Sequence, residues 1–477
     1  MTMILEAMTY LNGIFWGFLI LSLLVVSGVF YTVKCGCPQI RHFKSMFTNF
    51  KKEKSISGGI SGFAALCAAL GGQVGTGSLV GVAAALFSGG PGAIFWMWMT
   101  AVLGMVISFA EAVLGQLFRK SNGDGTYRGG PAYYMTYGMN NKYLAMAFSV
   151  CLIFGIGIVY LMVQGNSIAL AAESALNIEP IYTGIIIAIL VASVIFGGVK
   201  RLAEVASYLV PIMAAIYIGC TLVLLIGNFS LIDDVFMLIM TEAFNFDSAV
   251  GGAGGYTIAV ALRFGIARGL FSNDAGIGTA PSMHATALVK HPVNQGFSAM
   301  LGVFFTTIIV CSCTAFTIIV TGAMDSGESG IVLTQEAFKL GFGEYGKYIV
   351  LVSISLFCFT TLLADIYYGE VNLQWFSKNK TLINGYRVLA LGLVVISGVV
   401  SIDSLWTLVD FVLAIMVLIN VTALMYLSKY VFFALRNYDD QIKEGIETPV
   451  WDYTIDVTKA DLSQPANRVS EVRLAVD

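Results

Sequence analysis

The sequence predicts an all-α integral membrane protein with eleven transmembrane helices, and three observations support this prediction. The 477 residues are 57% hydrophobic and 12% charged, with a mean hydropathy of +0.82, which is far outside the range of soluble domains. Eleven apolar runs are long enough to cross a bilayer. The basic residues fall on alternate connections between these runs. The net charge of −3, without a dense basic segment, argues against nucleic-acid binding.

The first apolar run has no basic segment before it and is long enough to span, so we expect it to remain in the mature protein. The eleven spans are expected at residues 11–33, 57–88, 91–118, 142–172, 180–198, 202–227, 250–289, 293–322, 345–377, 382–400 and 404–435.

Loop charge predicts the orientation of the chain in the cell membrane, where it is a multi-pass protein. Connections on one side carry Lys34, Arg41, Lys44, Lys51, Lys52, Lys54, Arg119, Lys120, Arg128, Lys200, Arg201, Lys290, Lys378 and Lys380. Connections on the other side carry only Lys339 and, at a helix start, Lys347. The positive-inside rule therefore places the N-terminus outside and the C-terminal tail in the cytoplasm.

Two spans are interrupted. The span at 57–88 would be about 48 Å long as a straight helix, against a hydrocarbon core of about 30 Å. It contains "GGQVGTGSLVG" (71–81), and unwinding around Gly75 to Ser78 would use the excess length. The overlong span at 250–289 contains "GLFSNDAGIGTAP" (269–281). In lipid, unwound backbone is tolerated only where it faces protein or a wet cavity.

The two interrupted spans are five helices apart. Because five is odd, the second set of five enters the membrane from the opposite face, as in an inverted repeat that follows one leading helix. The predicted units are 1–56 (leading helix and cytoplasmic loop), 57–228 (first five-helix repeat), 229–249 (interfacial helix), 250–435 (second five-helix repeat) and 436–477 (cytoplasmic tail, soluble or partly disordered). The segment 230–245 is an interfacial helix or a plain loop, and 326–346 is a re-entrant hairpin or a plain loop.

Helix breaks at mid-membrane suit ion chemistry. The N-termini of half-helices offer N–H donors and a positive dipole end to a carboxylate, and free carbonyls bind a cation. An amino-acid zwitterion with sodium matches both requirements. The alternative is that the glycines only permit close helix packing.

Four motifs resemble the alanine or glycine:cation symporter family, and the resemblance extends over most of the chain. They are "GTGSLVGVAAALFSGGPGAIFWMW" (75–98), "GGPAYYM" (129–135), "GLFSNDAGIGTAP" (269–281) and "YYGE" (367–370). The resemblance implies a LeuT-type fold and a secondary active symporter, not an enzyme, which couples sodium entry to uptake of alanine or glycine by alternating access. Sodium is then the coupling ion and no organic cofactor is implied. Glutamine, serine or D-amino acids as substrates, and protons as coupling ions, remain alternatives, and the oligomeric state is open.

The resemblance and the breaks together suggest site residues. The expected substrate-binding residues are Gln73, Thr76, Gly77, Phe271, Asn273, Asp274 and Asp365, with amides near Thr76 and Gly77 receiving the carboxylate. The expected sodium ligands are Gly71, Val74, Thr360 and Thr361, with Ser78 and Ser272 as a second site. Oxygen ligands of this kind suit a hard cation. Trp96 and Trp98 are candidates, with Phe271, to close over a small side chain, and the alternative is that they are aromatic residues of the membrane boundary.

Three positions depart from the family pattern: Ser78 stands where Asn is usual, Asp274 where Glu is usual, and Asp365 where an uncharged residue is expected. A carboxylate at this depth is a functional candidate that would hold an ammonium or carry a proton. The alternative is a structural pair with Arg263 or Arg268. These arginines are more readily explained as partners of Glu111 or Asp410.

Other classes of protein have weaker support. A membrane enzyme would have to use His284 with Ser282 and Asp274, but the chain has three His and no nucleophile elbow. A channel is disfavoured by paired broken helices in an inverted repeat. The eight cysteines are scattered, and Cys35 and Cys37 with His42 lack the second ligand pair of a metal site.

Overall fold

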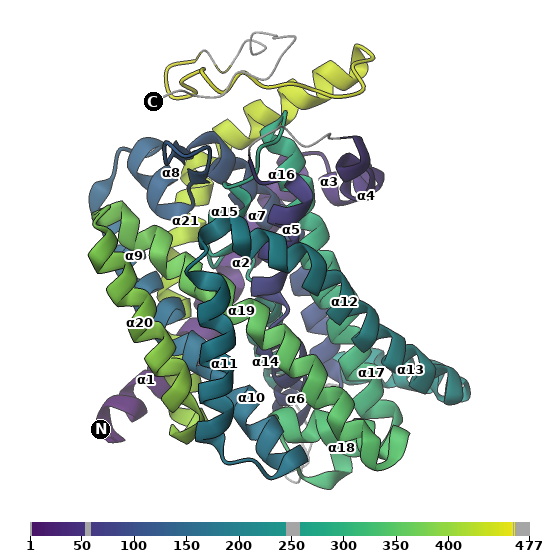
Figure 1. Cartoon of the computed structure of the whole chain (residues 1–477). Coiled ribbons are helices and arrows are strands. Elements are labelled where there is room, and N and C mark those ends of the chain that lie inside the picture. Colours follow the sequence, from purple (N-terminus) through teal and green to yellow (C-terminus); the bar gives the residue numbers. More distant parts are fainter. Residues whose placement is uncertain (1, 53–58, 245–257, 461, 463–477) are drawn as a thin grey trace.

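The computed structural model describes residues 2–52, 59–244, 258–460 and 462, and its architecture is a bundle of helices (Figure 1). The helices of the first half are α1 (Thr2–Ile14), α2 (Ile20–Lys34), α3 (Pro38–Arg41), α4 (Phe43–Lys52), α5 (Gly62–Gln73), α6 (Val82–Gly89), α7 (Gly92–Leu117), α8 (Pro131–Tyr137), α9 (Lys142–Phe154), α10 (Leu161–Leu176), α11 (Pro180–Ile195), α12 (Gly198–Gly227) and α13 (Ile232–Ala243). Those of the second half are α14 (Ile258–Asn273), α15 (Ala280–His284), α16 (Pro292–Val303), α17 (Ser312–Val320), α18 (Gly330–Phe342), α19 (Gly346–Phe376), α20 (Lys380–Ile396) and α21 (Ile402–Lys443). An antiparallel hairpin of β1 (Lys120–Ser121) and β2 (Tyr127–Arg128) lies between α7 and α8.

Among the described residues, eight helices are long and apolar enough to cross a membrane, and the bent pair α5–α6 makes nine. Two further expected spans correspond to α11, a shorter apolar helix, and to α14, which carries Arg263 and Arg268. The predicted membrane fold is confirmed, whereas the count of eleven spans stays a prediction. The expected starts of two spans, at 57–58 and 250–257, lie outside the described residues.

The first expected break is present between α5 and α6. α5 begins after Ser61, whose hydroxyl caps the Ala64 amide at 3.1 Å, and ends at Gln73. A π-helical turn, Gly77–Gly81, leads into α6, and the two halves are bent by 49°. The break starts at Val74, slightly earlier than expected, and Ser78 already lies in the π-helical turn, with its amide bonded to the Gly75 carbonyl.

The second expected break is present between α14 and α15. Asp274, Gly276 and Gly278 have φ values of 57°, 83° and 92°, and such left-handed backbone favours glycine and tolerates Asp. α15 then begins at Ala280, with Pro281 in its first turn, where the missing N–H is no loss. The motif thus encodes a helix stop, a left-handed turn and a helix start.

The segments 230–245 and 326–346, each of which could have been a plain loop, both contain helices. α13 buries Val235, Ile239 and Ala243 on one face and exposes acidic and apolar residues elsewhere. α18 packs beside the first break, where the Thr334 hydroxyl donates to the Leu79 carbonyl at 3.4 Å.

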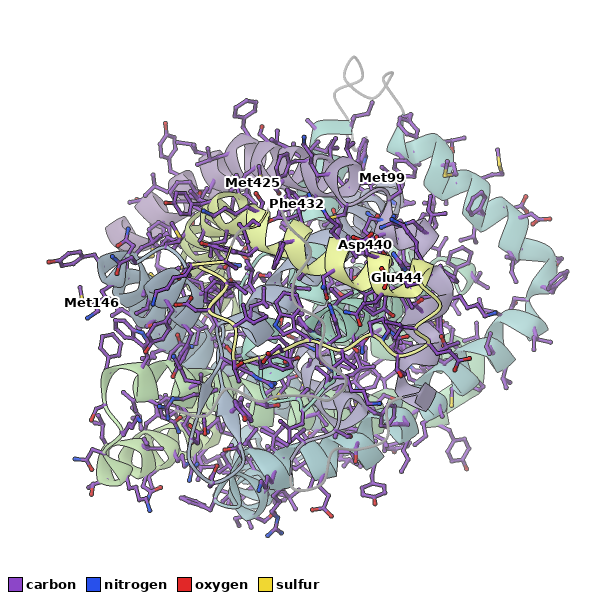
Figure 2. The ribbon with its side chains drawn as sticks, turned by 90° about the horizontal axis from the view of Figure 1, so that it is seen from above. Met99, Met146, Met425, Phe432, Asp440 and Glu444 are labelled. Atoms are coloured by element: carbon purple, nitrogen blue, oxygen red, sulfur yellow. The ribbon has the colours of Figure 1, made fainter. Side chains whose placement is uncertain are left out.

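The described part of the C-terminal tail contacts the helical body, which the sequence analysis did not anticipate. Seen from above, the last turns of α21, with Asp440 and Glu444, run across this face and the chain then turns back along it (Figure 2). The amide of Trp451 donates to the Lys290 carbonyl at 2.9 Å, and its indole lies 5.4 Å from the His291 ring. The reason is burial of aromatic side chains, since Trp451 is only 2% exposed.

We expect Trp451→Ala to release residues 446–460 from this surface, because removing a buried indole costs about 3–5 kcal/mol. Limited proteolysis of the purified full chain measures this as faster cleavage after α21. The matched control is Glu447→Ala, which changes an exposed residue of the same segment. Equal cleavage rates in the two variants would show that Trp451 does not hold the tail.

Candidate functional site

The two helix breaks meet in the core. The Gln73 side-chain amide donates to the Asn273 carbonyl at 3.0 Å, which joins the end of α5 to the end of α14. Gly77 makes this approach possible, because a Cβ atom at this position would lie 2.7 Å from the Phe271 carbonyl oxygen and 2.9 Å from the Ser272 Cα. The structure therefore brings the predicted residues of both interrupted spans to one place.

The four residues expected to bind sodium lie where α5 ends against α19. The Thr360 and Thr361 hydroxyls are 3.1 and 2.8 Å from the Gly71 carbonyl oxygen. Val74, at which the half-helix ends, follows Gly71 by three residues and is also buried. Within the described residues no group of three or more His, Cys, Asp or Glu could hold a metal ion. The donors here are carbonyl and hydroxyl oxygens, which suit a hard cation.

Ser78 and Ser272, the expected second cation site, also lie together. Their hydroxyl oxygens are 3.4 Å apart, and the Ser272 hydroxyl is 2.9 Å from the Cys311 sulfur. The Ser78 carbonyl accepts from Thr314 at 2.8 Å. This pair therefore offers fewer oxygen atoms than the group at Gly71 and has a thiol as a neighbour, which sequence reasoning missed.

The expected carboxylate-binding amide has a partner that was not predicted. The Thr76 amide donates to the side-chain carbonyl of Gln164, in the first turn of α10, at 3.0 Å. Gly75 allows this contact, because a Cβ there would lie 2.7 Å from the same oxygen and 2.6 Å from the Thr361 hydroxyl. The available signal was a lone glutamine inside an apolar span, which marks a candidate functional residue.

Six buried polar atoms near the first break have no hydrogen-bond partner among the residues that the structure describes. They belong to Gln73 (Oε1), Thr76 (Oγ1), Tyr160 (OH), Gln164 (Nε2), Asp365 (Oδ2) and Tyr368 (OH), which we call the central polar cluster. Asp365 and Tyr368 lie on α19 one and two turns beyond Thr361, on the same helix face. A Cβ on Gly72 would lie 2.7 Å from the Tyr368 hydroxyl, which places this residue against α5.

An aromatic layer adjoins the cluster. Phe271 meets Tyr160 edge-on at 4.9 Å and lies 4.7 Å from Trp406. The Arg268 guanidinium stacks over Trp406 at 4.6 Å and holds Asp410 with two bonds of 3.2 and 3.3 Å. Tyr160 and Trp406 were not among the predicted residues, because their spans gave no sign of which face meets Phe271.

Of the alternatives for the charged residues, Arg268 pairs with Asp410 and not with Asp365. Glu111 has no arginine partner among the residues that the structure describes. Its carboxylate accepts from the Gly276 amide at 3.1 Å and from Asn420 at 2.6 Å. Asp365 is 1% exposed and is unpaired at Oδ2 within the described chain, so the structural ion pair suggested for it is absent there.

Asn273 and Asp274 are used inside the second break. The Asn273 side chain donates to Thr307 at 3.2 Å and accepts from the Ala275 amide at 3.0 Å. The Asp274 carboxylate accepts from Thr279 at 2.9 Å. These bonds stabilise the left-handed turn, and they leave less of these side chains for a ligand than was expected.

The remaining candidates lie elsewhere. Trp98 donates to Ser312 at 2.8 Å, and Trp96 packs against Phe244 at 5.9 Å, so neither belongs to the layer around Phe271. His284 bonds Gln295 at 2.8 Å. With Asp274 bonded to Thr279, the suggested set of His284, Ser282 and Asp274 is not assembled as a catalytic triad.

Two interrupted helices that meet around buried, unpaired polar groups define a helical membrane transporter. The chain belongs to the sodium:alanine symporter family, whose model matches residues 1–453.

Named relatives agree with this membership. The chain is 38% identical to the probable sodium/glutamine symporter GlnT of Bacillus subtilis, over 91% of this chain and 90% of that protein. It is also 38% identical to the putative sodium/proton-dependent alanine carrier protein YrbD of the same organism, over 93% and 94%. A crystal structure of the Eremococcus coleocola manganese transporter, at 13% identity, aligns with a TM-score of 0.50 over 83% of this chain and 82% of that one, which shows a shared fold.

We expect Gly77→Ala to disrupt the meeting point of the two breaks, since its methyl group would press on the Phe271 carbonyl and overpacking costs about 1–3 kcal/mol. The measurement is the thermal unfolding midpoint of the purified protein, together with its uptake activity. Gly81→Ala is the matched control in the same π-helical turn, because a Cβ there meets only the Thr76 oxygen at 3.8 Å. Equal midpoints and activities for both variants would contradict the close approach.

Proposed function

We propose that this protein is a secondary active symporter that couples sodium entry to the uptake of a small neutral amino acid, alanine or glycine. The observation that carries the proposal is the central polar cluster beside the Gly71–Thr360–Thr361 oxygens. Buried polar atoms without partners are costly in lipid. A zwitterion supplies both donors and acceptors to such a cluster.

Each part of the substrate has a counterpart. The Thr76 hydroxyl and the Gln164 amide nitrogen are donors for the carboxylate, and they flank the Thr76 N–H at the start of the second half-helix. Gln73 Oε1 and Asp365 Oδ2 are acceptors for the ammonium group. Phe271, with Tyr160, limits the room for a side chain.

Sodium would be held by Gly71, Val74, Thr360 and Thr361, and Ser78 with Ser272 would form a second, weaker site. Because the Thr361 hydroxyl adjoins Gly75, one residue before Thr76, an ion and a carboxylate would stabilise the same stretch of unwound backbone. Shared dependence on one segment is a physical route to coupling.

The available driving force is sufficient. One sodium ion moving down about 100 mV releases about 2.3 kcal/mol, and a tenfold sodium gradient adds about 1.4 kcal/mol. Together these support accumulation of a neutral amino acid by a few hundredfold. We place the protein in the cell membrane with the N-terminus outside and the C-terminus in the cytoplasm, with alternating access through the two five-helix repeats.

Glutamine is the second candidate substrate. GlnT is named as a probable sodium/glutamine symporter, and the unpaired Asp365 oxygen is an acceptor that a side-chain amide would use. Protons are the second candidate coupling ion, since YrbD is named as sodium/proton-dependent.

Uptake of labelled alanine, glycine and glutamine into proteoliposomes tests the proposal. We expect saturable alanine or glycine uptake that requires an inward sodium gradient, and weaker uptake of glutamine. Flux that does not saturate and ignores the sodium gradient would indicate a channel and overturn the proposal. Uptake driven equally by a proton gradient without sodium would assign the coupling to protons.

We expect Thr361→Ala to raise the sodium concentration for half-maximal uptake about tenfold, since loss of one ligand bond of about 1.4 kcal/mol has that effect. The ratio of alanine to glycine uptake should stay unchanged. Ser353→Ala on the same helix is the control, because the Ser353 hydroxyl donates to the Ile349 carbonyl of its own helix at 2.8 Å. Unchanged sodium activation in Thr361→Ala would refute this ligand assignment.

We expect Asp365→Asn to alter the substrate preference or the pH profile of uptake, because it replaces the one buried carboxyl group of the central polar cluster with an amide that cannot ionise. Competition by a panel of amino acids, repeated across pH, measures both. Glu173→Gln, which neutralises an exposed carboxylate on α10, is the control. A preference and a pH profile identical to wild type would leave Asp365 with a structural role.

A further inference from the structure

We propose that two adjoining hollows beside the β1–β2 hairpin bind the phosphate headgroup of an anionic phospholipid. The hollows have volumes of about 400 and 430 Å³ and share Arg128, Gln374 and Lys378 in their walls. One extends between the hairpin and the starts of α12 and α20, and the other extends towards α8. We call them together the hairpin groove.

The hairpin groove is rich in positive charge. Its walls carry Lys120, Arg128, Lys378, Lys380 and Arg387, against only two acids, Asp124 and Glu370. Within the described chain, the first four of these cations have no acidic side chain within ion-pair distance. They therefore leave an excess of positive charge around the hollows.

Both acids are already engaged. Glu370 is held by Arg387 at 2.7 Å and also accepts from Gln374 at 3.0 Å. Asp124 accepts from the amide and the hydroxyl of Thr126 at 2.9 and 2.5 Å, and these bonds lower the pKa of its carboxyl. Neither acid is thus available to neutralise the four unpaired cations.

Arg128 points to the chemistry of the ligand. Its Nη1 donates to Asn122 at 2.6 Å, but its Nε is buried and has no acceptor among the residues described. A guanidinium whose N–H groups are only partly used is suited to a phosphate, which can accept several hydrogen bonds at once. Lys378, in the wall of both hollows, adds a second charge to the same ligand.

The position of the groove favours a lipid over a soluble anion. It lies at the ends of α19 and α20 that loop charge predicts to be cytoplasmic, where membrane surfaces attract basic segments. Three exposed aromatic residues, Tyr137 (46%), Phe196 (50%) and Phe376 (43%), belong to the elements around it. Aromatic residues of this kind are typical of the lipid–water boundary. Trp375 forms part of the wall beside Tyr137.

A bound phosphate would link the α7–α8 connection, through Arg128, to the α19–α20 turn, through Lys378 and Lys380. These segments are about 250 residues apart in the sequence, and side chains of both line the same hollows. The ligand would therefore stabilise the folded protein without touching the central polar cluster, so its binding can be measured independently of transport.

Native mass spectrometry of the full chain with added dioleoyl phosphatidylglycerol or dioleoyl phosphatidylcholine tests the site. We expect the wild type to retain phosphatidylglycerol selectively, and the triple variant Arg128→Gln, Lys378→Gln, Lys380→Gln to bind it about a hundredfold more weakly. This expectation follows because each basic residue near an anionic membrane surface strengthens binding about fivefold, and three such residues are removed. The control is Lys443→Gln with Lys459→Gln, since these lysines are already paired with Asp440 and Asp456.

Equal retention of phosphatidylglycerol by the wild type and the triple variant would overturn the proposal. A competition experiment with inorganic phosphate distinguishes a lipid headgroup from a free anion as the ligand. If phosphate at about 10 mM, a concentration at which even weak binding is detected, displaces the lipid or stabilises the protein as much as the lipid does, the groove is a soluble-anion site. The lipid assignment is then wrong. Should the triple variant unfold, Lys378→Gln alone, which changes an exposed side chain, keeps the comparison, with a fivefold weakening expected.

Discussion

The need to satisfy backbone polar groups inside a membrane governs the centre of this protein. An unbroken helix satisfies its own N–H and C=O groups, whereas each break releases several of them into a medium without water. Both breaks therefore exist only because other helices supply partners. At the first break α19 contributes the Thr360 and Thr361 hydroxyls to the Gly71 carbonyl, and α10 contributes Gln164 to the Thr76 amide. At the second break Glu111 of α7 receives the Gly276 amide.

The two breaks differ in how completely they are satisfied. Around the second break, Glu111, Asn420 and Tyr134 form a continuous chain of hydrogen bonds that includes both polar groups of Gly276. Such a network makes the turn rigid. Around the first break, the central polar cluster keeps unpaired donors and acceptors. The second break therefore acts as a fixed frame, and the first presents the groups that a ligand would complete.

Sequence reasoning predicted the membrane fold and both breaks because these depend on local features. Each break could be recognised within one segment. The first has excess span length with Gly75 and Gly77, and the second has Pro281 after a run of small residues. The resemblance to the family added Thr360 and Thr361, which composition alone does not single out. The membership in the family was confirmed, whereas the roles of the site residues stay predictions.

What sequence reasoning missed depends on which helix faces meet. Gln164, Tyr160 and Trp406 lie in different spans, and no pattern within a single span reveals that they converge on Thr76 and Phe271. The partner of Arg268 was left open among Asp365, Glu111 and Asp410 for the same reason, and in the structure it is Asp410. The polar composition of the tail also gave no sign of its contacts, which Trp451 makes with the α15–α16 connection and Tyr453 makes with α7.

The most direct test of the central claim is the equilibrium linkage between alanine and sodium in the purified protein. If the ion and the substrate complete the same stretch of backbone at the first break, sodium will raise the affinity for alanine, and alanine will raise the affinity for sodium by the same factor. Isothermal titration calorimetry should show a factor of at least about 5, which is the lower range of such coupling. Alanine binding that is identical with and without sodium would contradict a shared site.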